Sequence, residues 1–257
     1  MSTYGADPGA PDDPQARVLE ALLGMQRQSW EQGVASHALL DLGLDSLVEV
    51  MARDAVTRQT AAGKLAEIED GGIVNSAANG EAVRWAAGRS GNARLADAFD
   101  RQLRWITHDA PRAGDGTLFH IEGTREVWVD TVYMVVPFLV LAGELTQAAA
   151  QLAGHRARLF DESAGLYAAR WDEDTRRLTS GAFWGTGNGW SSPESRGRCG
   201  CWADATTRSG LRRPLARERS SMRAWRTGTR TGCSTTSSPT PARSARRTSP
   251  RCSRTPS

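Results

Sequence analysis

Apolar residues recur at three- and four-residue spacing along most of this chain, and the periodicity stops abruptly at Trp190. This spacing places apolar side chains on one face of a helix. The pattern predicts about seven helices joined in pairs by tight turns, with few strands and no alternation of strand and helix. We therefore expect an all-α fold in which antiparallel helical hairpins stack to bury a shared core.

The two sides of this boundary differ in charge and composition. The last 67 residues hold 15 arginines, no lysine and three acidic residues, so their net charge is +12, against −9 for residues 1–190 and +3 for the whole chain. They contain no Val, Ile, Phe or Tyr and cannot build a core. We expect a disordered leader over residues 1–14, a hairpin domain over 15–190 and a tail over 191–257.

The tail has three interpretations. An arginine-rich segment can bind the phosphates of nucleic acid, and a chain of this composition can also be simply disordered. A mixture of Arg, Ser, Thr, Pro and Cys also results when a GC-rich gene is read in a shifted frame. We favour this third hypothesis, a frameshift just after Trp190 or Ser191, and do not expect a nucleic-acid partner.

Several classes of site are excluded from the first 190 residues. That part has no cysteine, so it holds no disulfide or thiolate site. The four cysteines all lie in the tail, at Cys199, Cys201, Cys233 and Cys252. The histidines His37, His108 and His155 are interpreted as helix-surface residues, and their spacing suggests no metal site. We expect neither a metal nor another cofactor.

No segment is expected to cross or enter a membrane. The longest apolar run, Val132–Ala142, is about half of the roughly 20 residues that a bilayer span requires. The N-terminal residues lack the basic and apolar regions of a secretory signal. The sequence therefore predicts a cytoplasmic protein.

The first segment with unusual side chains covers residues 116–134. It places His120, Trp128 and Asp130 just before an apolar helix. Asp130 could simply cap that helix. Alternatively, its apolar neighbours could raise its pKa so that it donates a proton near neutral pH, beside aromatic rings that suit a sugar. Both interpretations remain open at this point.

The second segment is GAFWGTGNGW, residues 181–190, expected as a loop. Trp184 and Trp190 offer flat apolar faces for a pyranose ring, and Asn188 offers a donor and an acceptor for hydroxyl groups. Its glycines are not expected to form a phosphate-binding loop, because they follow no predicted strand and the lysine of a P-loop is missing. The segment favours carbohydrate binding over nucleotide binding.

The order of FH-I, WVDTVYMVVPFL, GLY, RWDE and FWGTGNGW, with MQRQSWEQGVASHALLDLG near the start, resembles the unsaturated glucuronyl and rhamnogalacturonyl hydrolases, glycoside hydrolase families 88 and 105. The resemblance covers residues 15–190. It implies an (α/α)6 barrel of helical hairpins, here incomplete at the C-terminus. It also implies hydration of the 4,5 double bond of a terminal unsaturated uronic acid in a small oligosaccharide, without metal or cofactor.

The resemblance also implies roles for individual residues. Asp130 becomes the general acid and base that protonates carbon 4 and helps water add at carbon 5. Substrate contacts fall to the following side chains: His120, Trp128, Trp184, Asn188 and Trp190.

The chain departs from the family pattern in three places. Thr186 stands where the family commonly has an arginine suited to the uronate carboxylate. The expected histidine after GLY falls on Ala168 or Ala169, and the second aspartate falls within Asn75–Asn79, for which Asn75 or Glu81 could substitute. These departures keep two alternatives open, a subgroup with a different substrate and a carbohydrate-binding protein without catalysis. A third alternative, an inactive truncated fragment that aggregates or is proteolysed, follows from the incomplete barrel, because about seven helices leave its faces uncovered.

Overall fold

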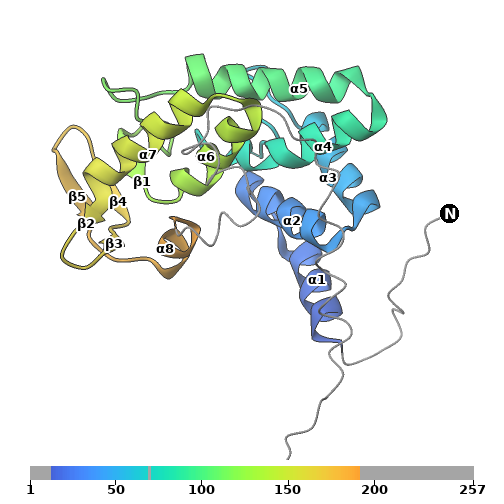
Figure 1. The fold of residues 1–257 in the computed structure, drawn as a ribbon, viewed down its shortest axis with the longest axis horizontal. Helices are drawn as coiled ribbons and strands as arrows, with labels where there is room; N and C mark the ends of the chain where they lie inside the picture. The colour runs from blue at the N-terminus through green and yellow to red at the C-terminus, as the bar shows by residue number, and fades with distance from the viewer. Residues whose placement is uncertain (1–12, 69–70, 192–257) are drawn as a thin grey trace, which may run out of the picture. The chain divides into compact units, whose positions relative to one another are not determined.

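The computed structural model describes residues 13–68 and 71–191 of the chain (Figure 1). The chain divides into two compact units, Met1–Ser209 and Gly210–Ser257, and every described residue belongs to the first. The predicted leader and tail lie outside the described residues, apart from residues 13, 14 and 191. The frameshift hypothesis and the proposed domain boundaries therefore stay predictions, and the four cysteines lie outside the described residues.

Helices make up most of the described chain, as the periodicity predicts. Those before residue 110 are α1 (Pro14–Met25), α2 (Ser29–Leu42), α3 (Asp45–Thr57), the 3₁₀ turn η1 (Asn75–Asn79), α4 (Gly80–Ser90), α5 (Ala93–Arg104) and the π-helical turn η2 (Trp105–Asp109). Those after it are α6 (Thr131–Ala142), α7 (Leu145–Leu159) and α8 (Gly185–Ser191). Sequential helices pack as hairpins: α2 with α3, α4 with α5, and α6 with α7. No helix among these residues combines the length and hydropathy needed to cross a bilayer.

Local sequence signals fix the helix ends. The side chain of Asn92 accepts a hydrogen bond from a backbone N–H in the first turn of α5, as expected of a cap. Gly43 and Gly143 end α2 and α6 in the left-handed conformation, at φ 67° and 89°. Glycine adopts this conformation without the steric cost that a Cβ brings. The turns of the α2–α3 and α6–α7 hairpins therefore each depend on a glycine.

Small residues let η1 pack closely between α2 and α6. A Cβ on Gly33 of α2 would overlap Ala78 of η1, and a Cβ on Gly80 would overlap the ring of Phe138 in α6. The side chain of Asn79 donates a hydrogen bond of 2.9 Å to a backbone carbonyl at the start of α2. These contacts place η1 in the buried core that the hairpins share.

Five short strands gather beside α7 and α8 (Figure 1). They are β1 (Glu126–Trp128), β2 (Phe160–Asp161), β3 (Leu166–Tyr167), β4 (Arg170–Asp172) and β5 (Arg177–Ser180). β4 lies between β1 and β5 in one antiparallel sheet, and β2 pairs with β3 in another. Trp128, expected just before the apolar helix, ends β1, whereas the expected loop around GTGNGW is instead the helix α8.

His155 of α7 corrects another expectation, because it is fully buried and not a helix-surface residue. Its Nδ1 lies 2.7 Å from the Gln151 carbonyl oxygen, and burial lowers the pKa of the ring to about 4. The unfolded chain, with an ordinary histidine pKa near 6.5, binds this proton more readily than the folded protein between about pH 6.5 and 4. Folding stability is therefore lost as pH falls through this window.

We expect this histidine to cost about 2–3 kcal/mol of stability between pH 7 and pH 4. The measurement compares urea unfolding of the wild type and His155→Gln at several pH values. The variant should be less stable at pH 7 and should lose less stability on acidification. Parallel losses in the two proteins would show that another group dominates the acid response.

Candidate active site

Asp130 sits at the junction between β1 and α6. It occupies the N-cap position of α6, but its side chain makes no capping hydrogen bond, and its Oδ1 is buried without a hydrogen-bond partner among the described residues. Burial raises its pKa from 3.8 to about 6, while the nearby charge of Arg170 acts in the opposite direction. Asp130 therefore does not cap α6 through its side chain, and its role as a proton donor stays a prediction.

An aromatic wall stands next to this carboxyl group. The rings of His120 and Trp128 are stacked, with centroids 4.6 Å apart and planes 7° apart. Trp184 meets Trp128 edge-on at 5.9 Å. His120 is only 4% exposed, and its Nδ1 lies 2.9 Å from the hydroxyl of Thr131. The structure therefore places His120 against one face of Trp128, while Trp128 and Trp184 are partly exposed, and contact of any of the three with substrate stays a prediction.

A second group of side chains surrounds Tyr133, which follows Asp130 by three residues on α6. Trp190 stacks on Tyr133 with centroids 4.9 Å apart, and the Tyr133 hydroxyl lies 2.8 Å from Nδ1 of His37. His37 Nε2 in turn lies 3.5 Å from a carboxylate oxygen of Glu81. His37 is thus part of an interior contact chain and not simply a helix-surface residue.

Burial and the charge of Glu81 raise the pKa of Tyr133 to about 12, and burial raises the pKa of Glu81 itself. Glu81, considered above as a substitute for the second aspartate, therefore connects to the helix of Asp130 through two side chains. Asn75, the other candidate, is buried against Gly72. The role of either residue in substrate binding stays a prediction.

Asn188 holds α8 against β3. Its Oδ1 accepts a hydrogen bond of 2.8 Å from the backbone N–H of Tyr167, and its Nδ2 donates at 3.0 Å to the carbonyls of Tyr167 and Trp184. Because these backbone groups occupy the amide, the geometry gives Asn188 a positioning role. The sequence-based prediction that it contacts sugar hydroxyls is not tested by these bonds.

Gly187 brings α8 close to the acid. A Cβ there would overlap Cγ1 of Val129 and lie 3.4 Å from Oδ1 of Asp130. The helix therefore covers Asp130 with backbone and excludes water from one side of the carboxyl group. Thr186, the neighbouring residue at which the resemblance implies an arginine, is exposed.

Arg170 is a residue of this arrangement that was not predicted from the sequence. Its guanidinium lies 3.7 Å from the ring centre of Trp128 and 4.9 Å from that of Trp184. The strand register explains the contact, since β1 and β4 pair Trp128 with Arg170. In the sequence, Arg170 belongs to the motif RWDE, which carried only the family resemblance. The residue pattern of so short a strand cannot show which residue of a distant strand the arginine contacts.

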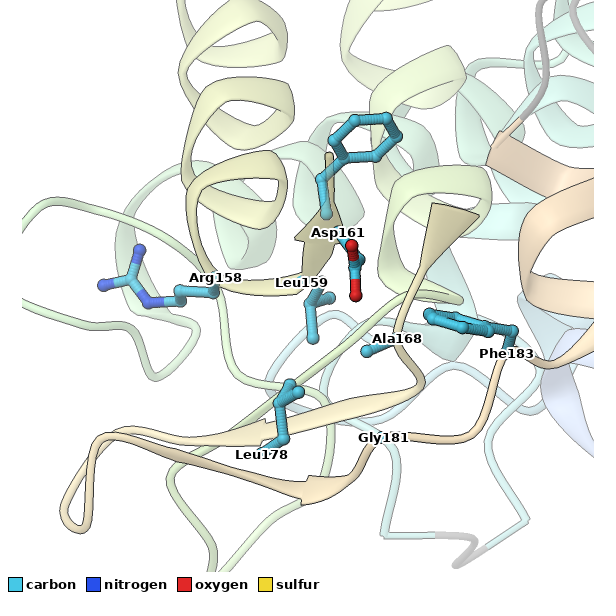
Figure 2. Close-up of a pocket in the computed structure, with 8 residues that line it drawn as sticks. Arg158, Leu159, Asp161, Ala168, Leu178, Gly181 and Phe183 are labelled. Atoms are coloured by element: carbon cyan, nitrogen blue, oxygen red, sulfur yellow. The ribbon is translucent and has the colours of Figure 1, made fainter. Parts of the chain in front are cut away.

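A hollow of about 280 Å³ lies elsewhere, at the end of α7. Figure 2 shows Leu159, Leu178 and Phe183 among the side chains that line it, with the guanidinium of Arg158 directed away from them. That guanidinium forms ion pairs with Asp115 and Glu173. None of the predicted site residues lines this hollow, so it is separate from the arrangement around Asp130.

The sequence model of Glycosyl Hydrolase Family 88 matches residues 19–192, which include all the predicted site residues. The chain belongs to this family. The finding confirms the resemblance drawn from the motifs. Asp130 and the side chains around it therefore lie within the family 88 domain.

This family 88 chain is similar to individual members of related families. It is 31% identical over 101 residues to the unsaturated rhamnogalacturonyl hydrolase YesR of Bacillus subtilis (strain 168), an alignment that covers 34% of the chain and 29% of that protein. Among solved structures, a possible family 105 member from Salmonella enterica serovar Paratyphi A aligns with a TM-score of 0.56 and 18% identity. The alignment covers 74% of this chain and 58% of the Salmonella protein.

A family 105 glycoside hydrolase from C. acetobutylicum aligns with a TM-score of 0.51 and 16% identity, over 63% of this chain and 50% of that one. These likenesses confirm the predicted fold, the helical-hairpin barrel of families 88 and 105. The family 88 chain spans roughly half the length of these solved structures.

Among residues 13–68 and 71–191, no group of three His, Cys, Asp or Glu side chains could hold a metal ion.

Proposed function

We propose that this protein is a glycoside hydrolase that hydrates the 4,5 double bond of a terminal unsaturated uronic acid in a small oligosaccharide. The observation that carries the proposal is the carboxyl group of Asp130, which is partly buried, free of a capping bond and raised in pKa to about 6. At that pKa a carboxylic acid is available to donate a proton near neutral pH. Family membership and the curated relative support the same class of substrate.

The proposed reaction uses one residue as acid and then as base. Asp130 donates its proton to carbon 4 of the double bond, and positive charge develops at carbon 5. A water molecule adds its oxygen to carbon 5 and returns a proton to Asp130, so the net change is the addition of one water. The hemiketal that results opens and releases the next sugar. Trp184 provides the apolar surface for the sugar ring, because His120 and Arg170 already cover the faces of Trp128.

The departures from the family pattern support a second candidate, a protein that binds carbohydrate without catalysis. Thr186 is exposed and uncharged, and Ala169, one of the two positions where a histidine is expected, is buried. Such a protein would bind saturated and unsaturated sugars alike. In either case the ligand is a small oligosaccharide, and a cytoplasmic location stays a prediction.

The direct test follows the ultraviolet absorbance of the enol ether in several unsaturated uronide disaccharides. We expect the full chain to remove this absorbance, with kcat/KM constant at low pH and falling about tenfold per pH unit above about pH 6. The sign follows from Asp130, since the reaction begins with its protonated form. Unchanged absorbance with every disaccharide would refute the proposal. Equal binding of the saturated disaccharides would then favour the second candidate.

A further inference from the structure

Arg170 is a cation held between two aromatic rings beside the candidate acid. It opens β4, opposite Trp128 in the β1–β4 register, and its guanidinium lies 3.7 Å from one tryptophan ring centre and 4.9 Å from the other. A guanidinium stacked on a ring has its N–H groups in its own plane, directed past the ring edge. The two tryptophans thus fix the position of the guanidinium group.

The donors of Arg170 have no acceptor in the described part of the chain. Its Nε is buried without a hydrogen-bond partner there, and no ion pair among those residues includes it. Neighbouring arginines differ: Arg158 pairs with two carboxylates, and Arg125 pairs with Asp174 at 2.7 Å. The charge of Arg170 lowers the pKa of the nearby Asp130, but no ion pair joins the two side chains, so no described carboxylate occupies the guanidinium donors.

We propose that Arg170 binds the carboxylate of a terminal uronic acid in the active site, in the place of the arginine that Thr186 replaces. The inference rests on the proposed function for its substrate, but the carboxylate contact itself needs no catalysis. Planar forks of N–H donors bind carboxylates with two parallel hydrogen bonds, and this geometry distinguishes an acid from an amide of the same shape.

The position of Arg170 also connects binding to proton transfer. The charge of Arg170 opposes the rise in the pKa of Asp130. A bound carboxylate would neutralise that charge and leave burial unopposed, so the pKa of Asp130 would rise further and a larger fraction of the acid would be protonated. The carboxylate of an unsaturated uronic acid is attached to carbon 5, next to the carbon that receives the proton. One ligand group would thus place the double bond and favour the reactive form of Asp130.

The test compares the wild type, Arg170→Gln and Arg170→Lys on two ligands, a saturated glucuronide and its uronamide, with binding followed by titration calorimetry. Both variants should weaken glucuronide binding, the glutamine by roughly 10- to 100-fold, as expected for a charge-assisted hydrogen-bond pair, and the lysine by less. Uronamide binding should change little. Arg177→Gln, on exposed β5 of the same sheet, is the matched control and should change neither ligand.

The same proteins are assayed on an unsaturated disaccharide, and their thermal melting verifies folding. If Arg170→Gln weakens both ligands equally, Arg170 only supports the tryptophans and the inference is overturned, whether or not the enzyme is active. If Arg170→Gln does not fold, the Arg170→Lys comparison decides in the same way. An inactive wild type that still binds glucuronide through Arg170 refutes the proposed reaction but supports the carboxylate site. A wild type that neither binds nor reacts refutes both.

Discussion

Asp130→Asn is expected to lower kcat on an unsaturated uronide disaccharide by about 10²- to 10⁴-fold, the range for loss of a general acid. Asparagine has nearly the same shape as aspartic acid, so the aromatic wall and the substrate contacts should remain. KM should therefore change little, and the loss should appear in kcat. The exposed Asp100→Asn on α5 is the matched control and should retain full activity.

The same variant should be more stable than the wild type at neutral pH. The pKa of Asp130 is raised to about 6 in the folded protein, so ionising it above that pH opposes folding. After a discount for partial exposure, we expect Asp130→Asn to gain about 1–2 kcal/mol at pH 7.5 and nothing below about pH 4. Thermal melts at the two pH values measure this difference. Undiminished kcat, or a variant destabilised equally at both pH values, would rule out Asp130 as a buried acid.

Most of the helical architecture could be predicted from the sequence, because its signals are local. Leu95 and Phe99 lie four residues apart on α5 and are both buried, as their spacing indicates. Gly143 ends α6 because the turn requires the left-handed backbone conformation. Asn92 precedes α5 because its side chain accepts a hydrogen bond from a backbone N–H of the first turn. His155 was misassigned although a signal existed: it precedes the buried Leu159 by one helical turn.

The features of the site that were missed depend on contacts between distant segments. The glycines of α8 lower its intrinsic helix propensity, so the sequence indicates a loop. The helix is set by packing of Gly187 on Val129 and by the bonds of Asn188 to Tyr167, neither of which a local pattern contains. Arg170 meets Trp128 through strand pairing across more than forty residues. The apolar neighbours of Asp130 in the sequence only singled it out as a candidate, and its role as general acid and base came from the family resemblance and stays a proposal.

Gly187→Ala is expected to lower kcat/KM by roughly 10- to 100-fold without removing any group that touches the substrate. The added methyl group would overlap Val129, which is fully buried and has no flexible end to move aside. α8 must therefore shift away from Asp130, and it carries Trp184 and Trp190 with it. Overpacking of this kind costs about 1–3 kcal/mol of stability. Steady-state kinetics and urea unfolding of the variant measure both effects.

Two other glycines of α8 separate this explanation from a general effect on the helix. A Cβ on Gly185 or Gly189 would meet nothing within 4 Å, so Gly185→Ala and Gly189→Ala should retain activity and gain up to about 1 kcal/mol from helix propensity. If α8 moves away in Gly187→Ala, water reaches Asp130 and lowers its pKa, and the fall in kcat/KM should begin below about pH 6. A Gly187→Ala enzyme as active as Gly189→Ala, with the same pH profile, would show that α8 does not bury the acid. The dependence of Asp130 on a glycine 57 positions away would then have to be abandoned.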